Sequence, residues 1–211
     1  MYIHTFDTNL KINQMKKLIY TATVLLLSTT LFAGGPKGGE YVVNQKTSAL
    51  EWTGKKVTGQ HEGTIAIKEG KINVNDGVIQ NGVLIIDMTS IIVTDLEDEG
   101  TNAKLKGHLS SDDFFGIQKH PTAILKIIKV ESKGGDKYHI HGELTIKGIT
   151  EKVEIPATIK MEENKLVAIG TAEIDRTKYG IKYGSGSFFD GLGDKAINDL
   201  FTVKFKVGAM L

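Results

Sequence analysis

KYHIHGELTIKGITEKVEIPATIKM, residues 137–161, is the stretch that decides the fold. Apolar and polar side chains alternate along it with the period of two that is typical of β-strands. Before the turn residues Lys147 and Gly148, one face holds Tyr138, Ile140, Gly142, Leu144 and Ile146. After the turn, the apolar face holds Val153, Ile155, Ala157, Ile159 and Met161. The stretch therefore predicts an antiparallel hairpin with one buried face.

The same alternation returns twice before the end of the chain, in residues 166–174 and 201–207. Four consecutive strands with one apolar face predict an antiparallel meander, and closure into a barrel removes exposed strand edges. We therefore predict an all-β fold, an extended antiparallel β-barrel of about eight strands. One or two short helices complete it.

The first half of the domain shows shorter strand-like runs. They are residues 41–43, 50–52, 64–67 and 72–74. Residues 69–71 are expected to form a turn, and Asn75-Asp76-Gly77 is a strong hairpin signal. Residues 83–86 and 124–128 are apolar at successive positions, which predicts strands covered on both faces.

Small residues are concentrated on the predicted inner face. They are Gly142, Ala157, Ala168, Gly170 and Ala172. Small inward side chains in such a barrel leave room for an elongated ligand. Trp52, Ile140 and Leu144 are expected to form walls of that space. The alternative is a barrel filled by its own side chains, as in a stress-protein or adhesion module.

KGHLSSDDFFGIQKHPTAIL, residues 106–125, interrupts the strand pattern with helix signals. Thr101 or Asn102 is expected to cap a short helix that carries Leu105 and Leu109 on one face. A second turn, capped by Ser110 or Ser111, precedes Pro121. The segment is expected to act as an amphipathic lid at the mouth of the barrel.

Two pairs of adjacent phenylalanines stand out. Phe114 and Phe115 follow the predicted helix, and Phe188 and Phe189 lie in a glycine-rich insertion between Asp175 and Asn198. Together they are expected to form an apolar collar where an apolar ligand enters. The alternative for Phe114 and Phe115 is that they only seal the core.

Polar side chains near these segments have two interpretations each. Arg176 either binds a ligand head group or, as the favoured alternative, closes the barrel end by donating to loop carbonyls. His108 either contacts a head group or makes a backbone hydrogen bond. His139 and His141, with Glu143, lie two apart on the polar face of a strand, which suggests a metal-assisted hydrolase or isomerase; a solvated exterior is the simpler explanation.

The beginning of the chain has the pattern of a secretory signal peptide over residues 1–33. Met15-Lys16-Lys17, with Met15 as a possible true start, precedes an apolar run from Leu18 to about Leu31, and Ala33 comes before a break of small residues. Residues 34–39 are expected as a linker and residues 40–211 as the folded domain. The chain has no cysteine, so an exported form relies on burial and sheet hydrogen bonds.

The net charge of the domain limits the kinds of partner that it is expected to bind. Residues 1–33 hold three of the 26 Lys and Arg and one of the 25 Asp and Glu, which leaves 23 basic and 24 acidic residues. A formal charge of −1 gives no field that attracts nucleic acid. Partners are therefore expected to be neutral, apolar or locally recognised.

Three motifs, GHLSSDDFFGIQKHP, GELTIKGITEKVEIP and DRTKYGIKYG, in this order and at these spacings, resemble the YceI family of exported polyisoprenoid-binding proteins. The resemblance covers roughly residues 40–211. It implies a lipocalin-like barrel whose cavity holds a long-chain lipid, such as an isoprenoid or fatty-acid derivative, often as a homodimer. The family commonly has an acidic or basic pair where this chain has Lys106-Gly107.

We therefore expect a non-catalytic, periplasmic or secreted lipid-binding protein. It needs no metal or cofactor beyond its lipid, and no integral membrane association remains after signal cleavage.

Overall fold

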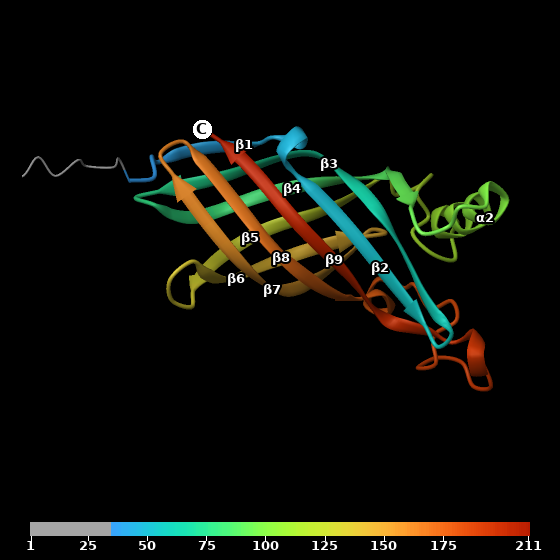
Figure 1. Ribbon diagram of the computed structural model, residues 1–211. Helices are drawn as coiled ribbons and strands as arrows, with labels where there is room; N and C mark the ends of the chain where they lie inside the picture. The colour runs from blue at the N-terminus through green and yellow to red at the C-terminus, as the bar shows by residue number, and fades with distance from the viewer. Residues whose placement is uncertain (1–34) are drawn as a thin grey trace, which may run out of the picture. The chain divides into compact units, whose positions relative to one another are not determined.

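The computed structural model describes residues 35–211, and the expected signal peptide lies outside these residues. Nine strands form one antiparallel sheet in the order β1-β3-β2-β9-β8-β7-β6-β5-β4. Pairing of β3 with β4 closes the sheet into a barrel (Figure 1). The strands are β1 (Gly39–Val43), β2 (Ala49–Lys56), β3 (Gly59–Asn75), β4 (Val78–Val93), β5 (Thr122–Ser132), β6 (Lys137–Ile146), β7 (Ile149–Glu162), β8 (Lys165–Asp175) and β9 (Ile197–Met210).

The barrel has eight strand positions because β1 and β2 share one of them. Both strands pair with β3 and with β9, β2 along one part and β1 along the other. The 3-10 helix η1 (Gln45–Thr47) separates them, and the Asn44 side chain accepts a hydrogen bond from the Lys46 amide at its start. The predicted eight-stranded antiparallel barrel is confirmed.

The meander of β6, β7, β8 and β9 follows the predicted alternation. Its β6–β7 turn uses Lys147 and Gly148, both with positive φ, and the β3–β4 turn uses Asp76 and Gly77 in the same way. Two consecutive positive φ values match the right-handed twist of the flanking strands, which is why the Asn-Asp-Gly signal was reliable.

Two expectations for the first half of the domain are wrong. The turn at residues 69–71 is absent, because β3 runs through it with an irregular register between Ile67 and Glu69. Residues 83–86 and 124–128 are not covered on both faces within the described part of the chain. Val83, Ile124 and Ile128 lie on the outer surface and are exposed.

The helix α2 (Glu99–Ser110) lies between β4 and β5 at one end of the barrel (Figure 1). Its N-cap is Asp98, whose Oδ1 accepts a hydrogen bond from the Thr101 amide at 2.7 Å; neither Thr101 nor Asn102 is the cap. The Asn102 amide group instead donates to the carbonyl oxygens of Val93 and Leu96. These bonds tie α2 to the end of β4, so the helix is held over the barrel.

The opposite end of the barrel is closed by tight packing. Tyr41, Leu166 and Ala209 are almost completely buried there. The Tyr41 hydroxyl lies 2.8 Å from the Glu163 carbonyl oxygen and 3.0 Å from that of Lys37. Residue 37, in the expected linker, is therefore attached to the barrel. Within residues 35–211, no helix has the length and apolar character needed to span a bilayer.

Candidate ligand-binding cavity

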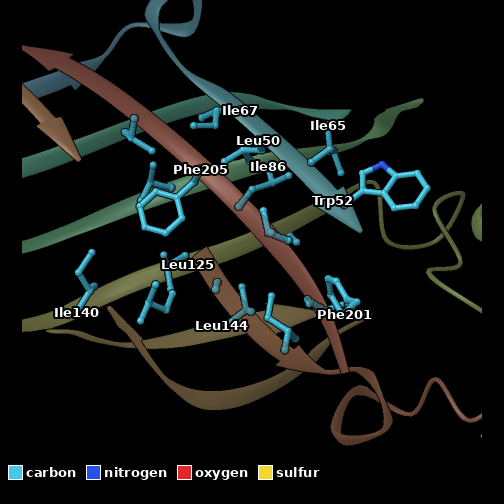
Figure 2. Close-up of a pocket in the computed structure, with 18 of the residues that line it drawn as sticks. Leu50, Trp52, Ile65, Ile67, Ile86, Leu125, Ile140, Leu144, Phe201 and Phe205 are labelled. Carbon is cyan, nitrogen blue, oxygen red and sulfur yellow. The ribbon is translucent and has the colours of Figure 1, made fainter. Parts of the chain in front are cut away.

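A cavity of about 220 Å³ runs through the interior of the barrel. Every strand from β2 to β9 contributes side chains to its lining, as do α2, the turn after it and Arg176, which follows β8. In Figure 2, the side chains of Ile86, Leu125, Leu144 and Phe205 point into this common space. The barrel is hollow, so the alternative of a barrel filled by its own side chains is wrong.

The lining is apolar along its whole length. Apart from the Trp52 indole, whose Nε1 donates to the Ile92 carbonyl oxygen at 3.2 Å, only Arg176 and Asn198 bring a polar side chain to it. Phe205, Leu125 and Ile86 face inward yet remain partly exposed, because their surfaces border the cavity. Such a lining favours a hydrocarbon chain over a polar ligand.

The structure brings together many of the predicted site residues. Those that line the cavity are Trp52, Leu109, Phe114, Phe115, Ile140, Leu144, Ala168 and Arg176. Those that do not line it are Leu105, His108, Ala157, Gly170, Phe188 and Phe189. Leu105 instead packs against the edge of the core, and Ala157 is buried within the wall of the barrel.

The inward glycines make room for aromatic rings of the protein itself. A Cβ at Gly170 would lie 2.7 Å from the Phe205 ring and would overlap the Pro156 carbonyl oxygen. Gly170 therefore shapes the cavity indirectly, by allowing Phe205 to lie close to β8. Gly63 does the same for Trp52, its direct partner across β2 and β3. Gly63 was not among the predicted site residues, because its position opposite Trp52 follows only from the pairing of β2 with β3.

One end of the cavity forms its mouth, which we define as Gly54, Phe115, Ile197, Asn198 and Phe201. Asn198 is the most exposed part of the lining. The rings of Phe115 and Phe201 meet edge to face, with centroids 6.2 Å apart. Gly54 lies just before the β2–β3 hairpin, Phe115 follows α2, and Ile197 pairs with Lys56 at the start of β9. The mouth therefore lies at the end of the barrel that carries α2 and this hairpin.

The structure does not bring the two phenylalanine pairs into one collar. Phe114 is buried, and its ring packs against Phe115 and Tyr183. Phe188 and Phe189 are 47% and 52% exposed and lie outside the cavity lining. The predicted collar does not form because hydrogen bonds from the Phe188 and Phe189 amides to the carbonyl oxygen of buried Ser185 hold both residues on the outer side of the segment before β9.

Arg176 organises that base. It begins the 3-10 helix η2 (Arg176–Tyr179) and is 3% exposed. Its guanidinium donates to four main-chain carbonyl oxygens at 2.8–3.0 Å, those of Ile181, Tyr183, Ile197 and Asn198. Burial lowers the pKa of Arg176, and nearby Asp199 and Asp175 oppose this effect. These donors hold the barrel end together, so few remain for a ligand head group.

His108 connects the two segments that cover the mouth. Its ring meets Phe114 edge to face at 4.8 Å between centroids and Tyr183 at 4.5 Å. The contact joins α2 to the segment between η2 and β9. His108 is therefore placed to couple these two segments rather than to reach into the cavity.

His139 and His141 lie on the outer face of the barrel. His139 Nδ1 contacts Glu154, and His141 Nε2 lies 3.4 Å from Glu131 Oε2. Hydrogen bonding and charge from Lys133, aided by Lys129, lower the pKa of Glu131 to about 2.

Within residues 35–211, no three His, Cys, Asp or Glu side chains are arranged to hold a metal ion. Glu143 instead faces Lys126 and Lys152 across its two neighbouring strands. The predicted trio of His139, His141 and Glu143 is therefore not assembled.

A family model described as YceI-like domain matches residues 41–209. The chain belongs to the YceI-like family. A UPF0312 protein of Vibrio parahaemolyticus is 26% identical over 185 residues, which cover 83% of this chain and 95% of that protein. A UPF0312 protein of Azotobacter vinelandii is 37% identical over 59 residues, or 28% of this chain and 31% of that protein.

Solved structures share the YceI-like fold. BcnA of Burkholderia cenocepacia superposes with a TM-score of 0.62 at 23% identity, over 80% of this chain and 99% of that one. A polyisoprenoid binding domain from Saccharophagus degradans gives a TM-score of 0.59 at 14% identity, over 81% of this chain and 97% of the domain. The Campylobacter jejuni YCEI protein gives 0.52 at 16% identity, over 100% and 99%.

Proposed function

We propose that this protein binds one long-chain, largely apolar lipid inside its barrel and carries or stores it without altering it. The observation that carries the proposal is the apolar cavity enclosed by strands β2 to β9. The fold is shared with a domain described as polyisoprenoid binding, which supports an isoprenoid or other long-chain amphiphile as the ligand.

The energetics suit such a ligand. Burying about 400–600 Å² of hydrocarbon at ~25 cal/mol/Å² gives roughly 10–15 kcal/mol as an upper bound. Lost translational freedom and ordering of the chain remove several kcal/mol of this gain. An apolar lining offers water few hydrogen-bonding partners, so a hydrocarbon chain competes well for the space.

The polar groups of the lining support binding rather than catalysis. Acid–base chemistry needs a titratable group within hydrogen-bond reach of the reacting atom. Arg176 is the one charged side chain among the lining residues, and four carbonyl oxygens occupy its donors. Asn198 is left as the polar group that orients a ligand at the mouth.

The proposal includes export and places the carrier in the periplasm or outside the cell. The pattern of residues 15–33 supports this step, since it has the basic, apolar and small-residue regions of a signal peptide. The proposal also includes a homodimer, which light scattering of the purified protein tests directly.

Extraction of the native protein tests the ligand. Protein purified without detergent is extracted with organic solvent, and the extract is analysed by mass spectrometry. We expect a long-chain lipid in near-equal molar amount. The variant Ala168→Phe places a ring inside the cavity and should lose it, whereas Thr171→Phe, on the outer face of the same strand, should keep it.

Two outcomes count against the proposal. One is an extract of the wild type without lipid in every preparation. The other is equal lipid content in Ala168→Phe and the wild type, with circular dichroism showing that both are folded. If Ala168→Phe does not fold, Ala172→Phe on the same inner face replaces it.

A further inference from the structure

The mouth of the cavity is bordered by a protruding surface, which we call the basic tip. It consists of residues 55–58, at the β2–β3 hairpin, and residues 177–196, between Arg176 and β9. The Val57 amide donates to the Ala196 carbonyl oxygen at 3.2 Å and joins the two parts. In Figure 1 the β2–β3 hairpin and the loop before β9 lie at the same end of the barrel.

Phe188 and Phe189 are held in exposed positions on this tip. The amides of both residues donate to the Ser185 carbonyl oxygen, at 3.2 and 3.0 Å. Ser185 itself is completely buried, and the Ile197 amide donates to the Gly184 carbonyl oxygen at 2.8 Å. The base of the loop is thus fixed, so the exposure of the two rings is built into the fold. Val57, 64% exposed, adds a third apolar side chain to the tip.

The tip carries a charge opposite to that of the rest of the domain. It contains five lysines and two aspartates, a formal charge of +3. The other residues from 34 to 211 contain 18 basic and 22 acidic side chains, a formal charge of −4. Lys182 Nζ lies 4.4 Å from the centre of the Phe188 ring.

The tip lysines have no carboxylate partner within the described part of the chain. They are Lys55, Lys56, Lys178, Lys182 and Lys195. None of them lies within 4.0 Å of a carboxylate oxygen of residues 35–211, whereas lysines on the barrel wall such as Lys71, Lys160 and Lys204 do form ion pairs. Their charge is therefore available to an external anionic surface.

We propose that the basic tip docks on an anionic lipid bilayer, with Phe188 and Phe189 entering the interface between head groups and acyl chains. Aromatic rings next to lysines are the side chains that partition to this depth, and each lysine near an anionic surface adds about a fivefold gain in partitioning. The mouth residues Ile197 and Asn198 directly follow the tip in sequence. Docking therefore places the mouth against the bilayer.

This inference deepens the proposed function, on which its purpose rests. A long-chain lipid is almost insoluble in water, so transfer into the barrel is favoured when the mouth faces the membrane that holds the lipid. The docking step itself does not depend on an occupied cavity. It can therefore succeed or fail independently of lipid binding.

The absence of cysteine allows a direct test, because one introduced cysteine takes one fluorescent label. Gly186→Cys places an environment-sensitive nitrobenzoxadiazole dye beside Phe188, at a position where an added Cβ meets no atom within 4 Å. Ser132→Cys, at the end of β5 next to the β5–β6 turn and at the opposite end of the barrel, is the matched control. Mass spectrometry is used to check that every variant has the same N-terminus as the wild type.

The labelled proteins are mixed with vesicles of phosphatidylcholine that contain about one-third phosphatidylglycerol, or none. We expect a blue-shifted, stronger emission at position 186 with anionic vesicles, a smaller change with neutral ones, and no change at position 132. Phe188→Ala/Phe189→Ala should lower the partition coefficient about tenfold. Lys182→Gln/Lys195→Gln should lower it about 25-fold, since each lysine contributes about a factor of five.

Matched variants of the barrel wall, Ile128→Ala/Ile169→Ala and Lys126→Gln/Lys206→Gln, should leave the partition coefficient unchanged. All four of these residues are exposed. The proposal is overturned if position 186 shows no response to anionic vesicles, or if the wall variants lose as much binding as the tip variants. A tip that binds a protein instead of a membrane gives the first of these results.

The two proposals fail in different ways. A protein that yields lipid on extraction but ignores vesicles retains the proposed function without the docking surface. A protein that docks but yields no lipid retains the docking surface without the carrier function.

Discussion

The two phenylalanine pairs have nearly the same local structure and opposite surroundings. The Phe114 amide donates to the Ser111 carbonyl oxygen at 3.1 Å, and the Phe188 amide donates to the Ser185 carbonyl oxygen at 3.2 Å. Yet Phe114 is 8% exposed and Phe188 is 47% exposed. The turn therefore sets only the local backbone at each phenylalanine. The elements packed around the ring decide whether it is buried.

Neighbouring side chains account for the contrast. Phe114 is covered by His108 and Tyr183, which come from two segments that meet over the mouth. The ring of Phe188 has the Lys182 ammonium group over its face, and this flexible side chain can follow it into an interface. Phe114 and Phe115 therefore form part of the cavity wall, whereas Phe188 and Phe189 face outward beside the mouth.

Replacing Arg176 should weaken this arrangement most. Arg176→Met leaves four carbonyl oxygens without their donor, at about 1 kcal/mol each, so we expect the free energy of unfolding to fall by about 4 kcal/mol. Urea denaturation followed by circular dichroism measures it. Lys178→Met, an exposed change on the same turn, should stay within about 0.5 kcal/mol of the wild type. A loss below about 1 kcal/mol for Arg176→Met would show that these four hydrogen bonds do not stabilise the fold.

Truncating one ring of each pair tests the contrast itself. We expect Phe114→Ala to lower the free energy of unfolding by about 3 kcal/mol, since it opens a cavity among packed aromatic rings. Phe188→Ala should change it by less than about 0.5 kcal/mol, since the ring is already half exposed. Equal losses, measured by the same denaturation, would contradict the assigned surroundings.

Tyr179 should make the stability of the loop base depend on alkaline pH. Tyr179 is 1% exposed, its hydroxyl has no hydrogen-bond partner among residues 35–211, and burial raises its pKa to about 12. Because the folded state holds the proton more tightly than the unfolded state, this contribution is complete below pH 10 and is lost as the pH rises towards 12. We expect a loss of about 2 kcal/mol across this interval.

Tyr179→Phe is the control for this prediction. It removes the ionisable hydroxyl and keeps the ring, so its stability should fall less steeply between pH 10 and pH 12 than that of the wild type. Parallel curves for the two proteins would mean that the hydroxyl of Tyr179 reaches solvent.

The contact that joins α2 to the tip should have the smallest effect. A double-mutant cycle with His108→Ala and Tyr183→Ala should give a coupling energy of about 1 kcal/mol, as expected for an edge-to-face pair of rings. The same cycle with His108→Ala and Phe189→Ala should give none. Coupling of the second pair would place Phe189 over the mouth after all.

The sequence predicted the barrel correctly in the strands that bury only one of their two faces. The alternation in residues 137–161 placed Ile140 and Leu144 inside correctly, because a one-residue shift of register would turn every side chain to the wrong face. The turn at residues 69–71 was predicted wrongly because Glu-Gly-Lys is typical of turns, whereas here Gly70 lies in β3 close to an irregularity in its register. The cap of α2 was misplaced because both Asp98 and Thr101 are good capping residues, and only the backbone path distinguishes them.

The candidate site was less predictable because it depends on contacts distant in sequence. Nothing local marks Gly63 as the residue that makes room for Trp52, since they meet only when β2 pairs with β3. Phe188 and Phe189 could not be separated from Phe114 and Phe115 by composition. The two pairs have different surroundings because the hydrogen bonds of Arg176, which link positions about 20 residues apart, fix the base of the segment that carries Phe188 and Phe189.

Quenching of Trp52 by a brominated long-chain lipid tests the central claim most directly. Trp52 is the only tryptophan of the chain and lines the cavity, and bromine quenches indole fluorescence only at short range. We expect saturable quenching with one lipid per barrel, and little quenching in Ala168→Phe. Fluorescence that does not change, or that falls equally in the blocked variant, would contradict a lipid-binding cavity in this protein.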